Sequence, residues 1–336
     1  MNRVGKEVLN VNELCGLTSA QAHHYSVYAL TQTVGYVYHG EAREVQRGIC
    51  EKIAYEIDGK EHRKAIFSWT KRKGQDRRMI LNVAKGDQSI AERFGCSVPA
   101  TCCGCPVCLL MGGLKTKGGE GDEARRIVSR LTYVDSFSVE EKPFTTVQRN
   151  YAIADVVAPI EKVEKVEVTM PFKVEVIMPG TRFPMVVHGM LLSDFEFGMY
   201  AYAFLNGLKH YGASGYKGYE LIREENGTPY LIVDKYTVPF IQPLYFDHTE
   251  TILERVKLVF KTEMKKKEEE RKIKDNAAYF ERILGNEAEE LLRTASKNFM
   301  NTINRFTPET KESYKNLVNQ IFVGAKNKIK AHVKRV

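Results

Sequence analysis

Residues 182–221 read RFPMVVHGMLLSDFEFGMYAYAFLNGLKHYGASGYKGYEL, and this stretch decides the fold. Alternating apolar residues predict a strand over its first part. Ser193 and Glu196 form a capping box, in which each side chain accepts a backbone N–H of the other residue, so a helix is expected to begin there. An apolar stripe of helical spacing follows: Phe197, Tyr200, Ala201, Phe204 and Leu208. Gly212 stands where a left-handed residue commonly ends a helix.

The flanking sequence predicts further strands. Residues 165–192 contain alternating runs around Pro179–Gly180–Thr181, which predicts a hairpin, and residues 219–225 and 229–236 flank the favoured turn Asn226–Gly227. Residues 26–40 and 65–70 are also rich in β-branched and aromatic residues. The order of an early strand, two strands, a helix and a strand is typical of a split βαβ arrangement, as in ferredoxin-like and RRM-like folds.

The remaining sequence predicts insertions and a helical end. Residues 94–124 hold five of the seven cysteines and a glycine-rich stretch, which indicates an inserted module. Residues 286–303 and the segment opened by Thr307–Pro308–Glu309 predict helices. We therefore expect an α+β fold with the following parts: an RRM-like core from 1–93 and 163–247, a zinc-binding insertion at 94–124, a β-hairpin insertion at 125–162 and a helical region at 248–336.

The composition is that of an ordinary globular protein. The 336 residues are 43% hydrophobic and 27% charged, and no apolar run reaches the roughly 20 residues that a membrane helix needs. The first residues lack an apolar stretch and a small-residue cleavage site, so secretion is not expected. These observations predict a cytoplasmic protein that does not contact a membrane.

Positive charge is concentrated in two places. Residues 60–78 hold eight bases and two acids, a local charge of +6, and the last 14 residues hold five bases and no acid. Such clustering indicates a polyanionic partner, with nucleic acid the first candidate. Phe67 and Trp69 lie between these bases, which suits base stacking beside phosphate neutralisation, although burial of both rings in the core is an equally good interpretation.

Cysteines at 96, 102, 105 and 108 have metal-ligand spacing. Three of them lie at three-residue intervals, and Cys96 can complete a tetrahedron of thiolates around zinc, with Cys103 or His62 as substitutes for one ligand. Four protein ligands leave no open position, so the zinc is expected to be structural. Buried thiols, disulfides and an iron–sulfur cluster are the alternatives.

Known catalytic motifs are absent from the sequence. It contains no GxSxG, HExxH or Walker motif, and the loop GASGYKG at 212–218 follows a helix instead of preceding one, which argues against a nucleotide-phosphate site. The loop suits contact with an RNA backbone or a plain turn equally well. We expect a protein that is not an enzyme, and keep an RNA endonuclease using Asp76, Asp87 or His62, and a zinc-stabilised protein-interaction module, as alternatives.

Two segments resemble a known family. CCGCPVCLLMGG at 102–113 resembles the cysteine-rich segment of the type I-D CRISPR backbone subunit, and YGASGYKGYEL at 211–221 resembles the glycine-rich loop of the RAMP superfamily. The resemblance implies a subunit that polymerises along CRISPR RNA in a Cascade-type complex, with other complex subunits and target nucleic acid as further partners. Members splay bases with a projecting hairpin, for which residues 138–165 are the candidate.

Combining the charge clusters with this resemblance, we expect the following residues to bind RNA: Arg63, Lys64, Trp69, Arg72, Arg77, Arg78, Arg149, Lys209 and Lys217. The aspartate with which related type III subunits cleave RNA has no counterpart that we can locate.

Overall fold

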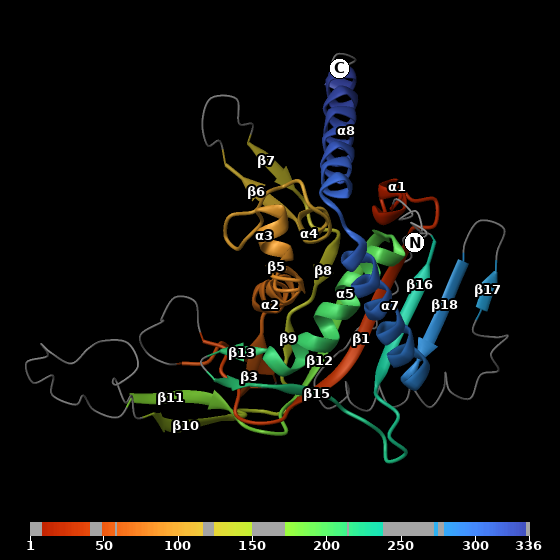
Figure 1. Ribbon diagram of the computed structural model, residues 1–336. Helices are drawn as coiled ribbons and strands as arrows, with labels where there is room; N and C mark the ends of the chain where they lie inside the picture. The colour runs from red at the N-terminus through yellow and green to blue at the C-terminus, as the bar shows by residue number, and fades with distance from the viewer. Residues whose placement is uncertain are drawn as a thin grey trace, which may run out of the picture.

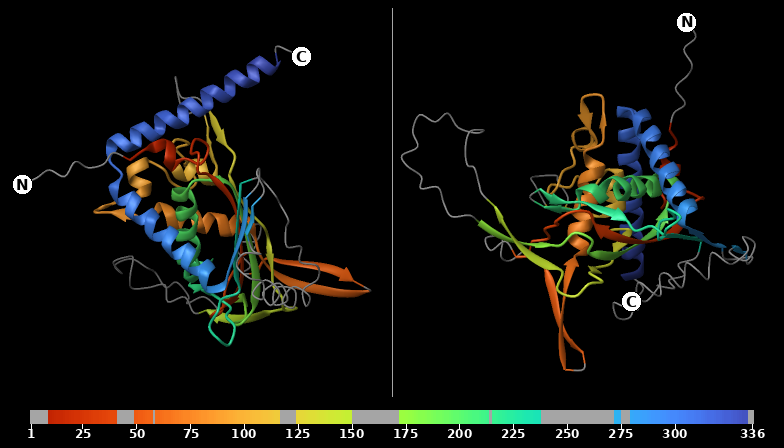
Figure 2. Two further views of the ribbon diagram at one scale, coloured as in Figure 1. Left: turned by 90° about the vertical axis from the view of Figure 1, so that its right-hand side faces the viewer. Right: turned by 90° about the horizontal axis from the view of Figure 1, so that it is seen from below.

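The computed structural model describes residues 9–40, 49–57, 59–116, 124–149, 172–213, 215–237, 272–274 and 279–333 (Figure 1). The helices of these parts are α1 (Val11–Leu14), α2 (Trp69–Leu81), α3 (Ile90–Phe94), α4 (Pro106–Met111), α5 (Asp194–Gly207), α7 (Gly285–Arg305) and α8 (Pro308–Val333), and the 3-10 turn η1 (Leu208–His210) follows α5. The second half of α8 extends beyond the rest of the molecule (Figures 1 and 2).

A central antiparallel sheet organises the molecule. Its strands, in spatial order, are β17 (Lys272–Lys274), β18 (Tyr279–Leu284), β16 (Leu231–Tyr236), β1 (His23–Thr33), β12 (Arg182–Leu192) and β8 (Leu131–Tyr133), and β15 (Tyr219–Leu221) pairs with one end of β1. In the middle of the sheet Val27 lies opposite both Val187 and Val233. β1 is buried over most of its length because it has neighbours on both sides and apolar side chains on both faces.

The helices pack on one face of this sheet. Tyr25, Val27 and Ala29 of β1 join the main hydrophobic core with α5, and the rings of Tyr25 and Phe197 stack with centroids 3.9 Å apart. The intervening residues Tyr28 and Leu30 belong to a second, smaller cluster on the opposite face. The alternation of a strand thus sends successive residues of β1 into two cores.

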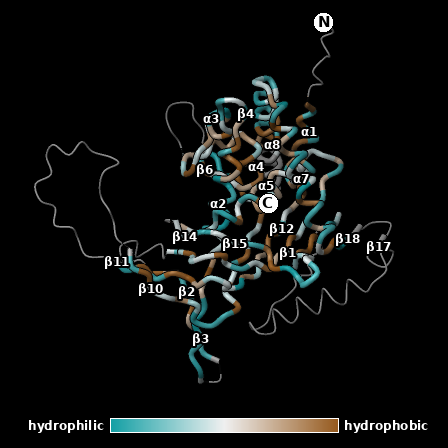
Figure 3. Tube along the Cα trace, turned by 60° about the horizontal axis from the view of Figure 1, so that its bottom comes forward, coloured by the Kyte–Doolittle hydropathy of each residue, from teal (hydrophilic) through white to brown (hydrophobic). Residues whose placement is uncertain are grey.

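Smaller sheets surround the centre. They comprise β2 (Lys52–Ile57), β3 (Lys60–Phe67) and β9 (Ser136–Phe137), and the pairs β10 (Phe144–Arg149) with β11 (Phe172–Ile177), β4 (Ala84–Lys85) with β5 (Gln88–Ser89), β6 (Gly113–Lys115) with β7 (Arg125–Ile127), and β13 (Gly212–Ala213) with β14 (Tyr216–Lys217). The β2–β3 hairpin extends away from the body (Figure 2), and its far end is hydrophilic (Figure 3). Its polar tip is consistent with this exposed position.

Several predicted elements are confirmed. The capping box is present at Ser193 and Glu196, and α5 begins at the next residue after the serine. Helices α7 and α8 occupy the predicted positions 286–303 and 308 onward. The predicted left-handed residue Gly212 has φ +120°, but it belongs to β13, because α5 ends earlier and continues as η1. A glycine is required at position 212 because the backbone of Tyr216 passes close by: a Cβ here would lie 2.3 Å from the Tyr216 carbonyl oxygen.

The predicted hairpin of residues 165–192 is wrong in its pairing. β11 pairs with β10 and β12 pairs with β1, although the turn between β11 and β12 lies where the sequence predicted it. Thr33 at the end of β1 explains the difference, because its hydroxyl donates to the Met178 carbonyl (2.7 Å) and accepts from the Thr181 N–H (3.0 Å). These bonds direct the chain along β1 instead of back along β11.

Two further predictions need correction. The strand predicted over 65–70 ends at Phe67, and Trp69 begins α2. The region 248–336 was predicted to be helical throughout, but β17 and β18 lie within it and extend the central sheet. β18 pairs antiparallel with β16 from Ile232 to Tyr236, and this pairing satisfies its backbone donors and acceptors on that side.

Candidate metal centre and nucleic-acid interface

The four predicted cysteines lie together. Cys96 follows α3, Cys102 lies in the following loop, and Cys105 caps α4, which carries Cys108 one turn later. Their sulfur atoms all lie within 4.8 Å of one another, with 3.5 Å between Cys96 and Cys108 and 3.9 Å between Cys102 and Cys108. The cluster is therefore built from two helix ends and the loop that joins them.

This geometry fits a metal ion. Zinc–sulfur bonds of about 2.3 Å place the sulfurs of a tetrahedron about 3.8 Å apart, close to the two distances observed. A disulfide needs sulfurs about 2.0 Å apart, and the seven cysteines are all free thiols. Cys103 lies outside the group, with its sulfur 3.7 Å from the Thr101 hydroxyl, and His62 lies on β3 beside Glu141. Both proposed substitutes are thus engaged elsewhere.

The four thiols are close enough to shift one another's pKa. Hydrogen bonds from the other thiols lower the pKa of Cys96 and of Cys102, whereas burial raises the pKa of Cys105. A bound cation deprotonates its thiol ligands, so metal binding by this group must release protons.

Arg77 of α2 contacts the cysteine cluster directly. Its guanidinium donates to the Cys108 sulfur (3.3 Å) and to the Gly112 carbonyl (2.8 Å). A cluster of four thiolates around a divalent cation carries a net negative charge, which a neighbouring guanidinium partly neutralises. The structure thus assigns Arg77 a neighbour different from the RNA that the sequence suggested.

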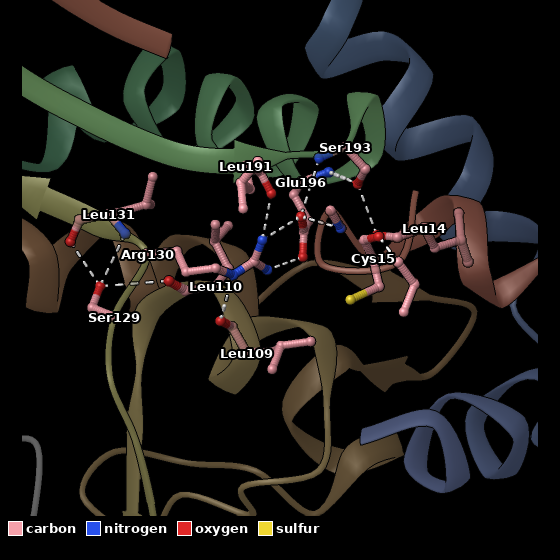
Figure 4. A network of polar contacts seen from close by, with 12 residues as sticks. Leu14, Cys15, Leu109, Leu110, Ser129, Arg130, Leu131, Leu191, Ser193 and Glu196 are labelled. Carbon is pink, nitrogen blue, oxygen red and sulfur yellow. Dashed lines mark hydrogen bonds and ion pairs between the residues drawn. The ribbon is translucent and has the colours of Figure 1, made fainter. Parts of the chain in front are cut away.

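A buried ion pair connects the cysteine module to the central fold (Figure 4). Arg130 forms a bidentate pair with Glu196, and it also donates to the carbonyls of Leu109 in α4 and Leu191 of β12. Glu196 in turn accepts the N–H of Gly16 (2.8 Å). Burial disfavours the charge of Arg130, but Glu196 outweighs it and raises the arginine pKa. No sequence motif pointed to this pair, whose members lie 66 residues apart.

Five of the predicted RNA contacts are exposed or lie at a surface. Arg63 lies on the β2–β3 hairpin, Trp69 is 45% exposed at the start of α2, and Arg78 is exposed at the end of that helix. Lys73 lies over the Trp69 ring, 5.9 Å from its centroid. Lys209 and Lys217 are exposed on η1 and β14, on either side of the glycine-rich turn. These side chains are accessible to a polyanion.

Two other predicted contacts lie inside the protein, and this part of the prediction needs correction. Lys64 is 1% exposed, and its ammonium donates to the carbonyls of Ser138 (3.2 Å) and Val139 (2.9 Å). Arg72 is equally buried and donates to the Val186 carbonyl (2.6 Å). The charge clusters of a sequence do not distinguish surface from interior, and here Lys64 of β3 and Arg72 of α2 lie on the sides of these elements that face the interior.

Arg149 lies at the end of β10, which is one arm of a β10–β11 pair. The second arm, Phe172–Ile177, belongs to the segment that the sequence assigned to the core. The residues between 149 and 172, which include most of the predicted hairpin tip, lie outside the described part of the chain.

The residues considered for an endonuclease do not form a catalytic group among the described residues. Asp76 is buried, and its carboxylate accepts the hydroxyls of Tyr133 (2.8 Å) and Tyr211 (2.6 Å). Burial raises the pKa of Asp76 to about 6, against the opposing effect of these hydrogen bonds. His62, on the projecting β2–β3 hairpin, contacts the Glu141 carboxylate (3.1 Å). Asp87 is an exposed turn residue between β4 and β5.

Comparison with known proteins identifies the architecture. Csc2 of Thermofilum pendens superposes with a TM-score of 0.50 and 14% sequence identity, over 95% of this chain and 94% of that chain. This chain has a Csc2-like fold. A chain of a CRISPR RNA-guided surveillance complex (TM-score 0.39, 13% identity, 71% of this chain and 83% of that chain) and one of a Type IV-B CRISPR complex (0.36, 9%, 69% and 98%) are less similar.

The Csc2-like fold is recognised through structure and not through sequence. No protein-family model matches the chain. No curated protein matches it either. Among the described residues, no helix of the Csc2-like fold is both long and apolar enough to cross a membrane.

Proposed function

We propose that this chain is a non-catalytic, RNA-binding backbone subunit of a type I-D CRISPR interference complex. It polymerises along the guide RNA, cradles the phosphate backbone and leaves the bases free to pair with target nucleic acid. Its partners are the guide RNA, neighbouring copies of itself and other subunits of the complex. The observation that carries this proposal is the Csc2-like fold, which extends over nearly the whole of both chains.

We also infer that the core is ferredoxin-like. The supporting observation is the spatial order β16–β1–β12–β8, in which all neighbours are antiparallel. In chain order α2 lies between β1 and β8, and α5 lies between β12 and β16, as a split βαβ arrangement requires. The cysteine module, the β10–β11 pair and the helices α7 and α8 then surround this core.

The metal is a structural zinc ion in this proposal. Four sulfurs complete a tetrahedral shell, which leaves no position for a substrate. The loop around it has few apolar residues between α3 and α4, so a metal supplies a constraint that packing does not.

The exposed members of the predicted set form the RNA contacts: Arg63, Trp69, Arg78, Lys209 and Lys217, with Arg149 at the β10–β11 arm. Lysine and arginine neutralise phosphates without reading sequence, and Trp69 offers a surface for one base. Backbone-led contact suits a protein that must accept guides of any sequence.

One purification tests the proposal. The protein, expressed beside a CRISPR array, should co-purify with RNA whose sequencing gives array-derived fragments, and labelled RNA should remain intact on incubation. Metal-dependent or pH-dependent cleavage would favour an endonuclease of the RAMP superfamily instead. A stable protein partner together with no affinity for RNA at low ionic strength would favour a zinc-stabilised interaction module.

A further inference from the structure

A cleft of about 940 Å³ opens between the end of α5, η1, β15 and the first half of α7. Its apolar lining comes from Leu205, Leu208, Leu221 and Ile222. Lys209, which the sequence predicted to bind RNA, is one of its lining residues. The cleft therefore lies beside the glycine-rich turn and continues from it onto α7.

The cleft collects positive charge from distant parts of the sequence. Lys209, Arg223, Arg293 and Lys297 contribute four positive charges and Glu220 and Glu289 two negative ones, which leaves +2 with His210 neutral. Within the described part of the chain, neither Lys209 nor Lys297 forms an ion pair. No local pattern predicts this group, because 88 positions separate Lys209 from Lys297.

Both acids of the cleft are already engaged by neighbours. Glu220 accepts a hydrogen bond from the Gln32 amide (2.7 Å). Glu289 is held by Arg223 (3.0 Å) and Arg293 (2.6 Å) at once. Burial acts against the charge of Glu289, but the two arginines prevail and hold its pKa below the ordinary value. One carboxylate thus orients two guanidiniums at the rim and neutralises only one of them.

The two arginines keep donors for a ligand. Each guanidinium carries five N–H donors, of which Glu289 and the Gly227 carbonyl use a minority. Arg223 is 42% exposed and Arg293 60% exposed at the side chain. Guanidiniums fixed in this way match the oxygens of a phosphate in a bidentate manner.

We propose that this cleft binds the sugar–phosphate backbone of single-stranded RNA. The inference rests on the proposed function and extends the RNA path from Lys209 to Arg293 and Lys297 of α7. Its lining is mainly aliphatic and charged, and Tyr219 is 2% exposed, so the cleft suits sugar and phosphate better than a stacked base. The exposed ring in this lining is the imidazole of His210, at the edge next to Lys209. An acidic segment of a partner protein is the alternative occupant that the experiment must separate.

The test is a salt titration of RNA affinity. Binding of a labelled single-stranded RNA is measured by fluorescence anisotropy for the wild type and the variant Arg293→Ala/Lys297→Ala. The plot of log K against log[salt] should become shallower by about 1.4, because each phosphate contact contributes about 0.7 on a single strand. The matched control Arg305→Ala/Lys315→Ala removes two exposed positive charges outside the cleft and should leave the slope unchanged.

The outcomes are distinct. Wild-type binding with an unchanged slope in Arg293→Ala/Lys297→Ala overturns this inference and leaves the proposed function standing. If the wild type binds no RNA at low ionic strength, both are overturned. Should the double variant unfold, the single change Lys297→Glu at an exposed helix position serves the same purpose and should weaken binding with a shallower slope.

A photo-crosslinking residue placed at Ser296, inside the cleft, identifies the occupant directly. In the assembled complex it should crosslink to RNA. Crosslinks to protein alone would assign the cleft to a subunit contact and overturn the inference.

Discussion

Replacing Arg130 by methionine should destabilise the whole fold, because it leaves the buried carboxylate of Glu196 without a positively charged partner. The Glu196 side chain has no solvent exposure and that of Arg130 only 8%, so water cannot replace the guanidinium. Removing one partner of a buried ion pair costs about 3–5 kcal/mol. Glu196 would still accept hydrogen bonds from the N–H groups of Gly16 (2.8 Å) and Ser193 (3.1 Å). We therefore expect a loss of unfolding free energy at the lower end of this range, about 3 kcal/mol.

The effect can be measured by urea unfolding at a fixed zinc concentration, with the fluorescence of Trp69, the single tryptophan, as the signal. In a thermal melt of the same variant, the melting temperature should fall by about 4 °C, at roughly 1.4 °C per kcal/mol for a chain of this size. The exposed Arg78→Met is the matched control and should change stability by no more than about 0.5 kcal/mol.

A double-mutant cycle separates this explanation from simple loss of packing. Arg130→Met/Glu196→Gln should be less destabilised than the sum of its two single variants, since the amide carries no charge that needs a partner. A loss below about 1 kcal/mol in Arg130→Met, or strict additivity in the double variant, would refute the reasoning.

The remaining predictions concern the metal, the buried acid and base stacking. Cys105→Ser should abolish the binding of one zinc ion per chain, measured by elemental analysis, whereas Cys103→Ser should retain it. The pKa of Asp76 is about 6 in the folded protein and 3.8 ordinarily, so the folded state binds the proton more tightly than the unfolded state. The free energy of unfolding should therefore fall by about 3 kcal/mol as the pH rises from below 4 to above 6. This loss is measured relative to the variant Asp76→Asn, which cannot titrate at this position. A pH profile identical in the variant would contradict this. Trp69→Ala should weaken RNA binding by about 1–3 kcal/mol, and an unchanged affinity would assign Trp69 no base.

Local chemistry made several features predictable. The capping box at Ser193 predicted the start of α5 because both of its hydrogen bonds lie within four residues. The cysteine cluster was predictable for the same reason, since three of its ligands lie within seven residues and Cys96 is close by. Turns at Gly180 and Gly227 also follow from local backbone preference, and both glycines have positive φ.

Burial of the basic residues was not predictable. Residues 60–78 look like one positive surface in the sequence, yet Lys64 and Arg72 point into the protein, Arg77 contacts Cys108, and Arg63 and Arg78 remain exposed. Charge counting assigns all of them the same role. Which side of a strand or helix faces the interior depends on the neighbours that cover it.

By itself, the sequence determined the capped start of α5, the helices α7 and α8, the grouping of the four cysteines and the basic character of the chain, because each depends on residues close together along the backbone. Only the tertiary structure decided that β11 pairs with β10 instead of β12 and that Arg130 forms an ion pair with Glu196. It also decided that α7 places Arg293 and Lys297 in the cleft beside Lys209. These pairings join residues dozens of positions apart. Their partners are selected by the packing of the entire core, which no local pattern records.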